Sequence, residues 1–360
     1  MDEIVPGLRA QAKGIKIFVE HEFAPLKAAL IGNPSATYVP DPDFPENARL
    51  LAQSSKKMKA FMRKHKGKHL RDADPKLYDK VVHASDSLAD TYRQAGVKVI
   101  RNETGKTPPE VVNYFGSWMP DKHLSMYGQN CFEVLGNVLV STWEVPTCQV
   151  HEFTYRDAMN ELFKNNPEAT WLSMPVPYPT TSSYNPGPFL SPGDFRIFPG
   201  KILLLGIGVP DPSWIKDPSK PRSSGDEYGA DILRRMLKPY GWRVETVYFD
   251  SRLTYHLDCL IGLVDVGLIA MPKNSLWTPL PKEFQDWEVI EVSAEDVHKG
   301  GCNTVPLGNK QVVLTRGVPK FSKEISKRGY TPVEVPFEAA YQTFDSGIHC
   351  ATASIWREYD

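Results

Sequence analysis

The segment Gly347–Trp356 reads GIHCATASIW, in which Cys350 follows a glycine-bearing turn and opens a short apolar strand. Four earlier segments also place a polar residue before an apolar run, a tight turn and a second apolar run. This pattern is typical of a β-hairpin. The four copies are NCFEVLGNVLVST from Asn130, DFRIFPGKILLLG from Asp194, DCLIGLVDVGLIAM from Asp258 and NTVPLGNKQVVLT from Asn303.

Each hairpin is followed by a helical segment and then a strand, the order of a repeated ββαβ unit. The clearest helix, SGDEYGADILRRMLKPYG, has Ser224 as its expected N-cap and a stop over residues 239–241. The last two units have shorter helical pieces, near 281–286 and in KFSKEISKRG. The hairpin turns are expected at Gly136-Asn137, Pro199-Gly200, Val264-Asp265 and Gly308-Asn309.

The N-terminal unit lacks its first hairpin strand. LKAALIGNP predicts one strand, DPKLYDKVVHASDSLADTYRQAG predicts a helix that begins at Asp74-Pro75, and VKVI predicts the next strand. CATASIW fits the missing place if the units close into a ring, because a closed array leaves no exposed sheet edges. Five side chains then converge near the axis of the ring: Asn130, Asp194, Asp258, Asn303 and Cys350.

The composition is that of a globular protein that binds a small molecule. The 360 residues carry a formal net charge of -1, so we expect no nucleic-acid partner. The sequence has no apolar run of about 18 residues and no signal-peptide pattern at its start, so we expect a cytoplasmic protein without a membrane partner. The five cysteines lack C-x-x-C spacing, and we expect reduced thiols, no disulfide, no metal and no cofactor.

A thiolate, a histidine and carboxylates that face one point suit nucleophilic attack on an electrophilic, positively charged carbon, and a guanidinium carbon is one. His256 lies two residues before Asp258, so on an extended strand both point to the same side. His349 neighbours Cys350 and is expected on the opposite side, in a structural role. The flanking cysteines are expected to fill the core: Cys131, Cys259 and Cys302.

Five stretches of the chain carry a family resemblance, and they span nearly its whole length: EFAPLKAALIGNP from residue 22, GDFRIF from 193, RSSGDEYGADILRRMLKP from 222, HLDC from 256 and GIHCAT from 347. In this order they resemble the amidinotransferases of the guanidino-group-modifying (pentein) superfamily, whose relatives include arginine deiminases, agmatine deiminases and dimethylarginine hydrolases. The resemblance implies an α/β fold, a five-bladed α/β propeller. It would form a single catalytic domain over residues 1–360, closed by the C-terminal strand.

The resemblance also implies residue roles. Cys350 would be the nucleophile, His256 the general acid and base, and Asp258 a guanidinium ligand. Asp194 would orient the histidine or hold substrate. The remaining expected substrate contacts are Asn130, Ser191, Asn303 and Lys273, the last as a stand-in for a basic residue that meets the substrate carboxylate.

Two of these positions depart from the family pattern. The family usually has an aspartate at the place of Asn130 and an acidic residue at the place of Ser191. A neutral side chain offers a hydrogen bond but no charge, so each departure reduces the attraction for a guanidinium.

The leading hypothesis is therefore transfer of an amidino group from a guanidino donor, arginine, to an amine acceptor. Two alternatives stay open. Asn130 leaves room for a hydrolase acting on the same intermediate, and Ser191 for a catalytically silent propeller that binds a small molecule. The donor, the acceptor and the oligomeric state, monomer or homodimer, are not fixed by the sequence.

Overall fold

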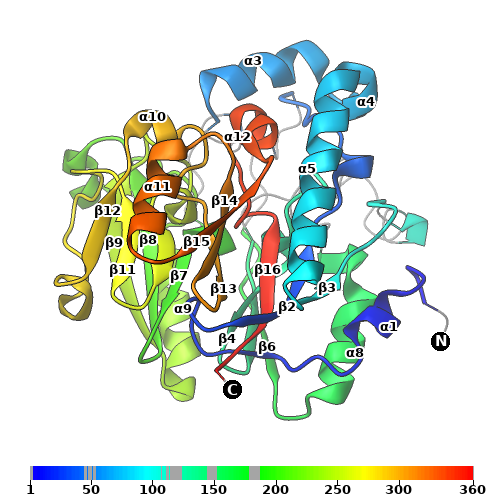
Figure 1. The fold of residues 1–360 in the computed structure, drawn as a ribbon, viewed down its shortest axis with the longest axis horizontal. Coiled ribbons are helices and arrows are strands. Elements are labelled where there is room, and N and C mark those ends of the chain that lie inside the picture. Colours follow the sequence, from blue (N-terminus) through cyan, green and yellow to red (C-terminus); the bar gives the residue numbers. More distant parts are fainter. Residues whose placement is uncertain are drawn as a thin grey trace.

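The structure, a computed structural model, describes residues 3–43, 47, 51, 54–106, 108–110, 113, 124–143, 152–177 and 187–359. These residues form five separate small β-sheets with helices around them (Figure 1). Four of the sheets have three strands and one has four. Within the described ranges, no helix is both long and apolar enough to cross a membrane.

The three-stranded sheets repeat one topology. An antiparallel hairpin is followed by a third strand that runs parallel to the second hairpin strand. Parallel neighbours need a crossover connection, which the intervening segment supplies. The repeat predicted from the sequence is thus confirmed. The sheets are β4 (Glu133–Leu135), β5 (Val138–Ser141) and β6 (Thr170–Ser173); β7 (Phe195–Phe198), β8 (Ile202–Val209) and β9 (Arg243–Asp250); β10 (Gly262–Asp265), β11 (Leu268–Met271) and β12 (Glu288–Glu291); β13 (Val305–Gly308), β14 (Gln311–Thr315) and β15 (Thr331–Val335).

The four-stranded sheet joins the two ends of the chain. Its strand order is β1 (Phe18–Val19), β16 (Thr352–Arg357), β2 (Leu26–Ile31) and β3 (Lys98–Ile100). β16 pairs antiparallel with β2, so the C-terminal segment takes the place of the missing hairpin strand, as predicted. Figure 1 shows β16 beside β2. β1, which pairs parallel with β16, was not expected, because a two-residue strand leaves no periodic pattern.

Capping residues predicted the starts of two helices, and one of these predictions is confirmed. The Asp74 side chain accepts a hydrogen bond from the Leu77 amide at the start of α5. In α9 the N-cap is Asp226 rather than Ser224, whose hydroxyl instead donates to Asp194, so that prediction was wrong. The helices of the described ranges are α1 (Leu8–Ala12), α3 (Lys56–His65), α4 (Leu70–Ala73), α5 (Pro75–Gln94), α8 (Arg156–Asn165), α9 (Glu227–Leu237), α10 (Ala294–Val297), α11 (Pro319–Lys327) and α12 (Glu338–Phe344).

Two of the four hairpin turns lie where they were predicted, between β4 and β5 and between β7 and β8. The turn after β10 lies at Val266-Gly267 instead of Val264-Asp265, because Gly267 supplies the left-handed φ of 84°. The turn after β13 lies one residue later than predicted, at Asn309-Lys310, where both residues have positive φ.

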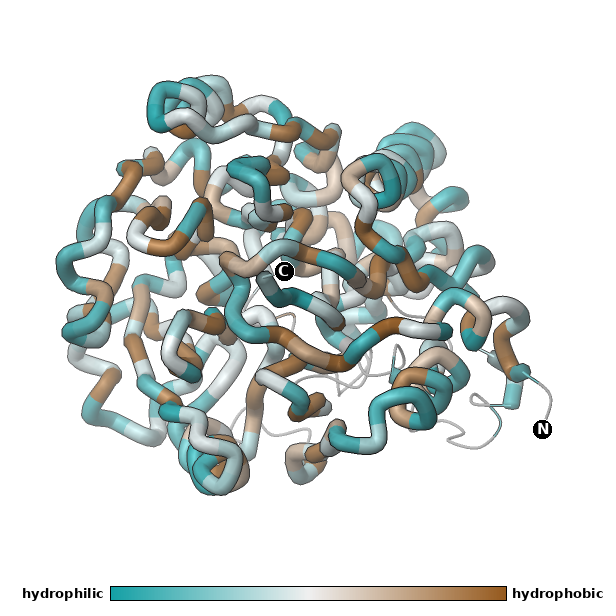
Figure 2. Tube along the Cα trace, turned by 60° about the horizontal axis from the view of Figure 1, so that its bottom comes forward, coloured by the Kyte–Doolittle hydropathy of each residue, from teal (hydrophilic) through white to brown (hydrophobic). Residues whose placement is uncertain are grey.

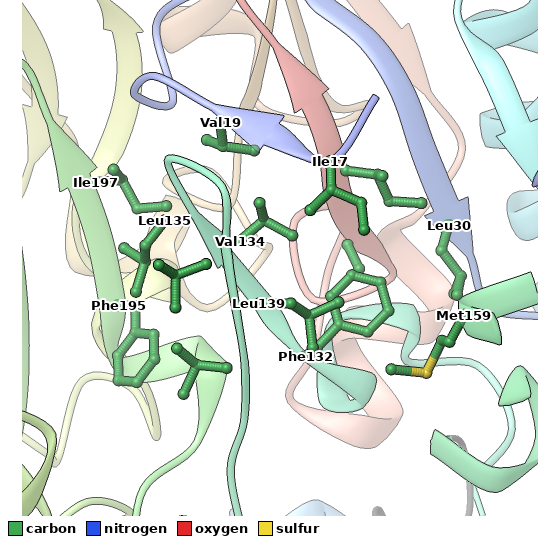
Figure 3. Close-up of a cluster of buried hydrophobic side chains, with 14 of the residues drawn as sticks. Ile17, Val19, Leu30, Phe132, Val134, Leu135, Leu139, Met159, Phe195 and Ile197 are labelled. Atoms are coloured by element: carbon green, nitrogen blue, oxygen red, sulfur yellow. The ribbon is translucent and has the colours of Figure 1, made fainter. Parts of the chain in front are cut away.

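Apolar residues of the repeated strands form the cores between neighbouring sheets. In Figure 3, Val19 of β1, Val134 and Leu135 of β4, Leu139 of β5 and Ile197 of β7 lie together, all fully buried. Figure 2 shows hydrophilic residues along the outer helices and loops, with more hydrophobic ones inside. The sheets therefore pack on one another through strands that are apolar on both faces.

Candidate active site

Short turns before the hairpins hold the polar residues of the repeat. Three of these are 3₁₀ turns: η4 (Gly128–Cys131) carries Asn130, η5 (Pro192–Asp194) carries Asp194, and η8 (Leu257–Cys259) carries Asp258. Cys350 lies in the turn that precedes β16 rather than in the strand itself. The backbone therefore presents each polar residue at the same place relative to its sheet.

Cys350, Asp258 and Asn303 meet in one buried cluster. The Cys350 thiol donates to Asp258 Oδ2 at 3.1 Å. The Asn303 amide nitrogen lies 3.2 Å from the same oxygen and 3.3 Å from Cys350 Sγ. Asn303 Oδ1 in turn accepts from the main-chain amide of His349 at 2.7 Å. Gly347 allows this close approach, since a Cβ there would collide with the Asn303 amide group. Three of the five predicted axis residues are thus in direct contact.

Cys259 belongs to the same cluster. Its sulfur lies 3.8 Å from the sulfur of Cys350 and 3.3 Å from the Asn303 amide nitrogen. Cys259 is buried in a hydrophobic cluster, as expected, but its contact with Cys350 was not predicted. It lies in the turn η8. Cys302 is buried in a hydrophobic cluster as expected, and the side chain of Cys131 lies outside the described residues.

Behind the cluster lies a buried network of charges. His349 Nδ1 is 3.0 Å from Asp258 Oδ2, and His349 Nε2 is 2.8 Å from Glu22 Oε2. Arg196 donates to that Glu22 oxygen at 2.8 Å and to the main-chain carbonyl of Asp258 at 2.7 Å. His349 thus holds the carboxylate that faces Cys350, and the two side chains meet the same oxygen instead of facing opposite sides as expected.

The network keeps both carboxylates ionised. Burial alone would raise the pKa of Asp258, but the hydrogen bond and charge of His349, with Arg196 and His256, hold it well below its usual range. Burial of Glu22 is likewise opposed by Arg196 and His349, which lower its pKa to about 2. Burial and Arg196 lower the pKa of His349, yet Glu22 and Asp258 prevail and raise it to about 9. Both ring nitrogens of His349 then donate to carboxylates.

The two neighbouring thiols differ in acidity. Burial and the charge of Asp258 raise the pKa of Cys350, but hydrogen bonds from Cys259 and Ser346 and the positive charge of His256 outweigh them, so that it lies below its ordinary value. The hydrogen bond to Cys350, together with burial, raises the pKa of Cys259 well above its ordinary value. Cys350 is therefore the more readily ionised thiol and the better nucleophile.

His256 lies beside η5, near the cluster. A Cβ on Gly193 would collide with the His256 ring, so glycine permits this approach. The charge of His256 contributes to the pKa of both Cys350 and Asp258, which places the imidazole within electrostatic reach of them.

Asp194 accepts from the Ser224 hydroxyl, from the Gly225 amide at 2.9 Å and from the Ser191 amide at 3.2 Å. These contacts fix the turn that carries Gly193, against which the His256 ring lies.

The remaining predicted residues lie at different distances from the cluster. Ser191 is buried, and its hydroxyl accepts from the Gly193 amide as the N-cap of η5. Asn130 is partly exposed, and the amide of its neighbour Gln129 donates to the Cys350 carbonyl. Lys273 is exposed and pairs with Glu291 at 2.6 Å, so the structure does not bring it to the buried cluster.

No model of a known protein family and no curated protein matches the chain by sequence. Solved structures do match its fold. SxtG, an amidinotransferase from Microseira wollei in the saxitoxin biosynthetic pathway, has a TM-score of 0.71 and 17% identity over 96% of this chain and 98% of its own. Inosamine-phosphate amidinotransferase StrB1 from Streptomyces griseus has a TM-score of 0.69 and 18% identity, over 96% of this chain and 98% of its own. The N-terminal domain of ArgZ, an arginine dihydrolase from cyanobacteria, has a TM-score of 0.57 and 14% identity, over 92% of this chain and 97% of its own. The chain has the α/β fold of these proteins.

Proposed function

We propose that the chain is an amidinotransferase that moves an amidino group from a guanidino donor, arginine, to an amine acceptor. The observation that carries the proposal is the Cys350 thiol 3.1 Å from the carboxylate of Asp258. The second oxygen of that carboxylate, Oδ1, is buried and has no hydrogen-bond partner among the described residues. A guanidinium that donates to Oδ1 would satisfy it while bringing its carbon to the sulfur.

The reaction would proceed in two halves. A guanidinium held by Asp258 offsets the negative charge beside Cys350 and favours the thiolate. The thiolate attacks the guanidino carbon, the bond from that carbon to the substituted nitrogen breaks, and His256 protonates the departing amine, which is ornithine when the donor is arginine. The amidino group then remains on Cys350. An amine acceptor loses a proton to His256, attacks the same carbon and expels the thiolate.

A hydrolase would need a different leaving group: if ammonia rather than ornithine leaves the Cys350 adduct, water can attack the carbon bonded to sulfur and release citrulline. The likeness to ArgZ makes this the second candidate, whereas the higher TM-scores of SxtG and StrB1 favour transfer. The side chains around Cys350 serve both outcomes, since each needs a nucleophile and a proton carrier.

The proposal includes the arrangement of the five sheets as a closed five-bladed propeller. Contacts between neighbouring sheets support it: β16 packs on β4, β10 on β13, and β13 on β2. Between the second and fourth sheets, the turns η4, η5 and η8 contact one another in sequence. The single bridge between Val19 and Gly136 adds a link from the first sheet to the second. In a closed ring these turns would all lie at the axis, where Cys350 and Asp258 meet.

Mass spectrometry of the intact protein after incubation with arginine tests the chemistry. We expect a gain of one amidino group on wild type and on Cys302→Ala, a matched buried cysteine outside the cluster, and no gain on Cys350→Ala. Turnover of Cys350→Ala should fall by at least about 10³-fold while its circular dichroism stays native. Ornithine beyond one equivalent per chain that forms only with an added amine supports transfer, and citrulline with ammonia indicates hydrolysis. An unmodified wild type that releases neither product would contradict the proposal.

A further inference from the structure

Cys259 and Cys350 bring two thiols to the carboxylate of Asp258. The sulfur atoms are 3.8 Å apart, and one ligand atom from each of the three residues lies within 4.8 Å of the other two. All three residues are buried, with exposed fractions of 0–5%. The proposed amidino transfer uses Cys350 and Asp258, but it gives the second thiol no role.

The spacing of the two sulfurs fits one tetrahedral metal ion. Zinc binds thiolate sulfur at about 2.3 Å, and the tetrahedral angle then separates two sulfur ligands by roughly 3.8 Å. This is the distance found between Cys259 and Cys350. A carboxylate oxygen on the same ion would lie roughly 3.5 Å from each sulfur. Asp258 Oδ2 is now 3.1 Å from Cys350 Sγ, and an Asp258 oxygen lies within 4.8 Å of both sulfurs, so side-chain adjustment can bring it to the third ligand position.

A disulfide would require the two sulfurs to approach from 3.8 Å to about 2.05 Å. A metal ion spans the existing distance without that movement.

Neighbouring groups would support bound thiolates. The Asn303 amide nitrogen lies 3.3 Å from both sulfurs, so it can donate to either one after the proton leaves. Such donors around metal ligands hold them in place. Asp258 Oδ1 has no hydrogen-bond partner in the described part of the chain and offers a further free acceptor.

We propose that Cys259, Cys350 and Asp258 form a binding site for Zn²⁺. The ion takes two thiolates and one carboxylate oxygen, both thiol protons leave to solvent, and water fills the fourth position. Thiolate ligands select Zn²⁺ over Mg²⁺ and Ca²⁺, which prefer oxygen. Because Cys350 and Asp258 are also the groups proposed to act on the guanidino donor, bound zinc blocks the reaction.

A titration of the full chain with Cd²⁺ tests the site, because Cd²⁺ bound to thiolates absorbs in the ultraviolet through ligand-to-metal charge transfer. The protein is stripped of metal and kept reduced with a phosphine. We expect one Cd²⁺ per chain, displaced by Zn²⁺ and not by Mg²⁺. Cys259→Ser keeps the size of the side chain but removes the thiolate. It should weaken Cd²⁺ binding by more than about 100-fold, because losing even a residue that only hydrogen-bonds to a metal ligand lowers metal affinity about 10- to 100-fold. Cys302→Ser, a matched buried cysteine, should bind like wild type.

Equal Cd²⁺ binding by wild type and Cys259→Ser would overturn the proposal, and so would loss of binding in Cys302→Ser. Circular dichroism of each variant shows whether it is folded. If Cys259→Ser is unfolded, Asp258→Asn supplies the second arm, with the same expected weakening of Cd²⁺ binding. The titration uses no guanidino compound. The metal site can therefore be refuted while the proposed function holds, and the proposed function can be refuted while the metal site holds.

Discussion

His349 Nδ1 lies 3.0 Å from Asp258 Oδ2, so the residue next to Cys350 in sequence holds the carboxylate that faces Cys350 in space. The other ring nitrogen of His349 faces Glu22, and Arg196 lies against both. The carboxylates of Asp258 and Glu22 therefore belong to one connected network of charges. Three predictions address its parts.

The first concerns charge at the donor site. Asp258→Asn should weaken arginine binding by at least about 30-fold, because removing one partner of a desolvated charge pair costs 2–5 kcal/mol. Asn130→Asp should strengthen arginine binding, because it adds a carboxylate in the turn next to Cys350. Calorimetric titration of both variants with arginine measures this. Unchanged affinity in both would show that the guanidinium does not bind at Asp258.

The second concerns Glu22. Glu22→Gln leaves Arg196 and His349 buried without their shared carboxylate, which should lower the free energy of unfolding at pH 7 by about 3–5 kcal/mol. Because the folded pKa of Glu22 lies near 2 and its ordinary value is 4.5, its contribution is present above pH 4.5 and is lost as the pH falls toward 2. Urea unfolding of the variant and of wild type should therefore converge in acid.

The matched control is Glu20→Gln, two residues earlier and exposed. Its free energy of unfolding should equal that of wild type both at pH 7 and at pH 3. A deficit for Glu22→Gln that stays constant from pH 7 to pH 3 would contradict the ion-pair account.

The third concerns Glu133, whose pKa burial and the charge of Glu22 raise to about 8. An unfolded chain loses this proton near pH 4.5 but the folded protein keeps it, so this group costs stability as the pH rises from 4.5 to 8. Glu133→Gln stays neutral throughout. It should raise the melting temperature at pH 8 and leave it nearly unchanged at pH 4.5, with a gain on the order of a few kcal/mol.

Glu168 is exposed, and Glu168→Gln serves as the control. It should leave the melting temperature unchanged at both pH 8 and pH 4.5. If Glu133→Gln proves no more stable than wild type at pH 8, the carboxyl is not held neutral in the folded state.

The repeat could be read from the sequence because each hairpin combines an apolar run, a turn residue and a polar residue at a fixed offset. The C-terminal strand and the contact of Cys350, Asp258 and Asn303 followed from that offset. Glu22 and Arg196 could not be found this way. They lie 174 residues apart, and Arg196 within the apolar strand FRIF resembles an outward-facing residue, although it is fully buried.

The contact of Cys259 with Cys350 was missed for a different reason. Alternation along a strand assigns neighbours to opposite sides, and it was applied to His256 with Asp258 and to His349 with Cys350. Both segments are turns in the structure. A turn can direct successive side chains toward the same point, which is how the sulfur of Cys259 comes to lie beside that of Cys350.

The pairing of β16 with β2 also sets an order of events during synthesis. β2 leaves the ribosome long before its antiparallel neighbour, residues 352–357. Until then the first sheet has an open edge on β2, and such a long-range pairing slows folding. Cys350 lies in the turn just before that neighbour, so a nascent chain acquires β16 and the Cys350 thiol together.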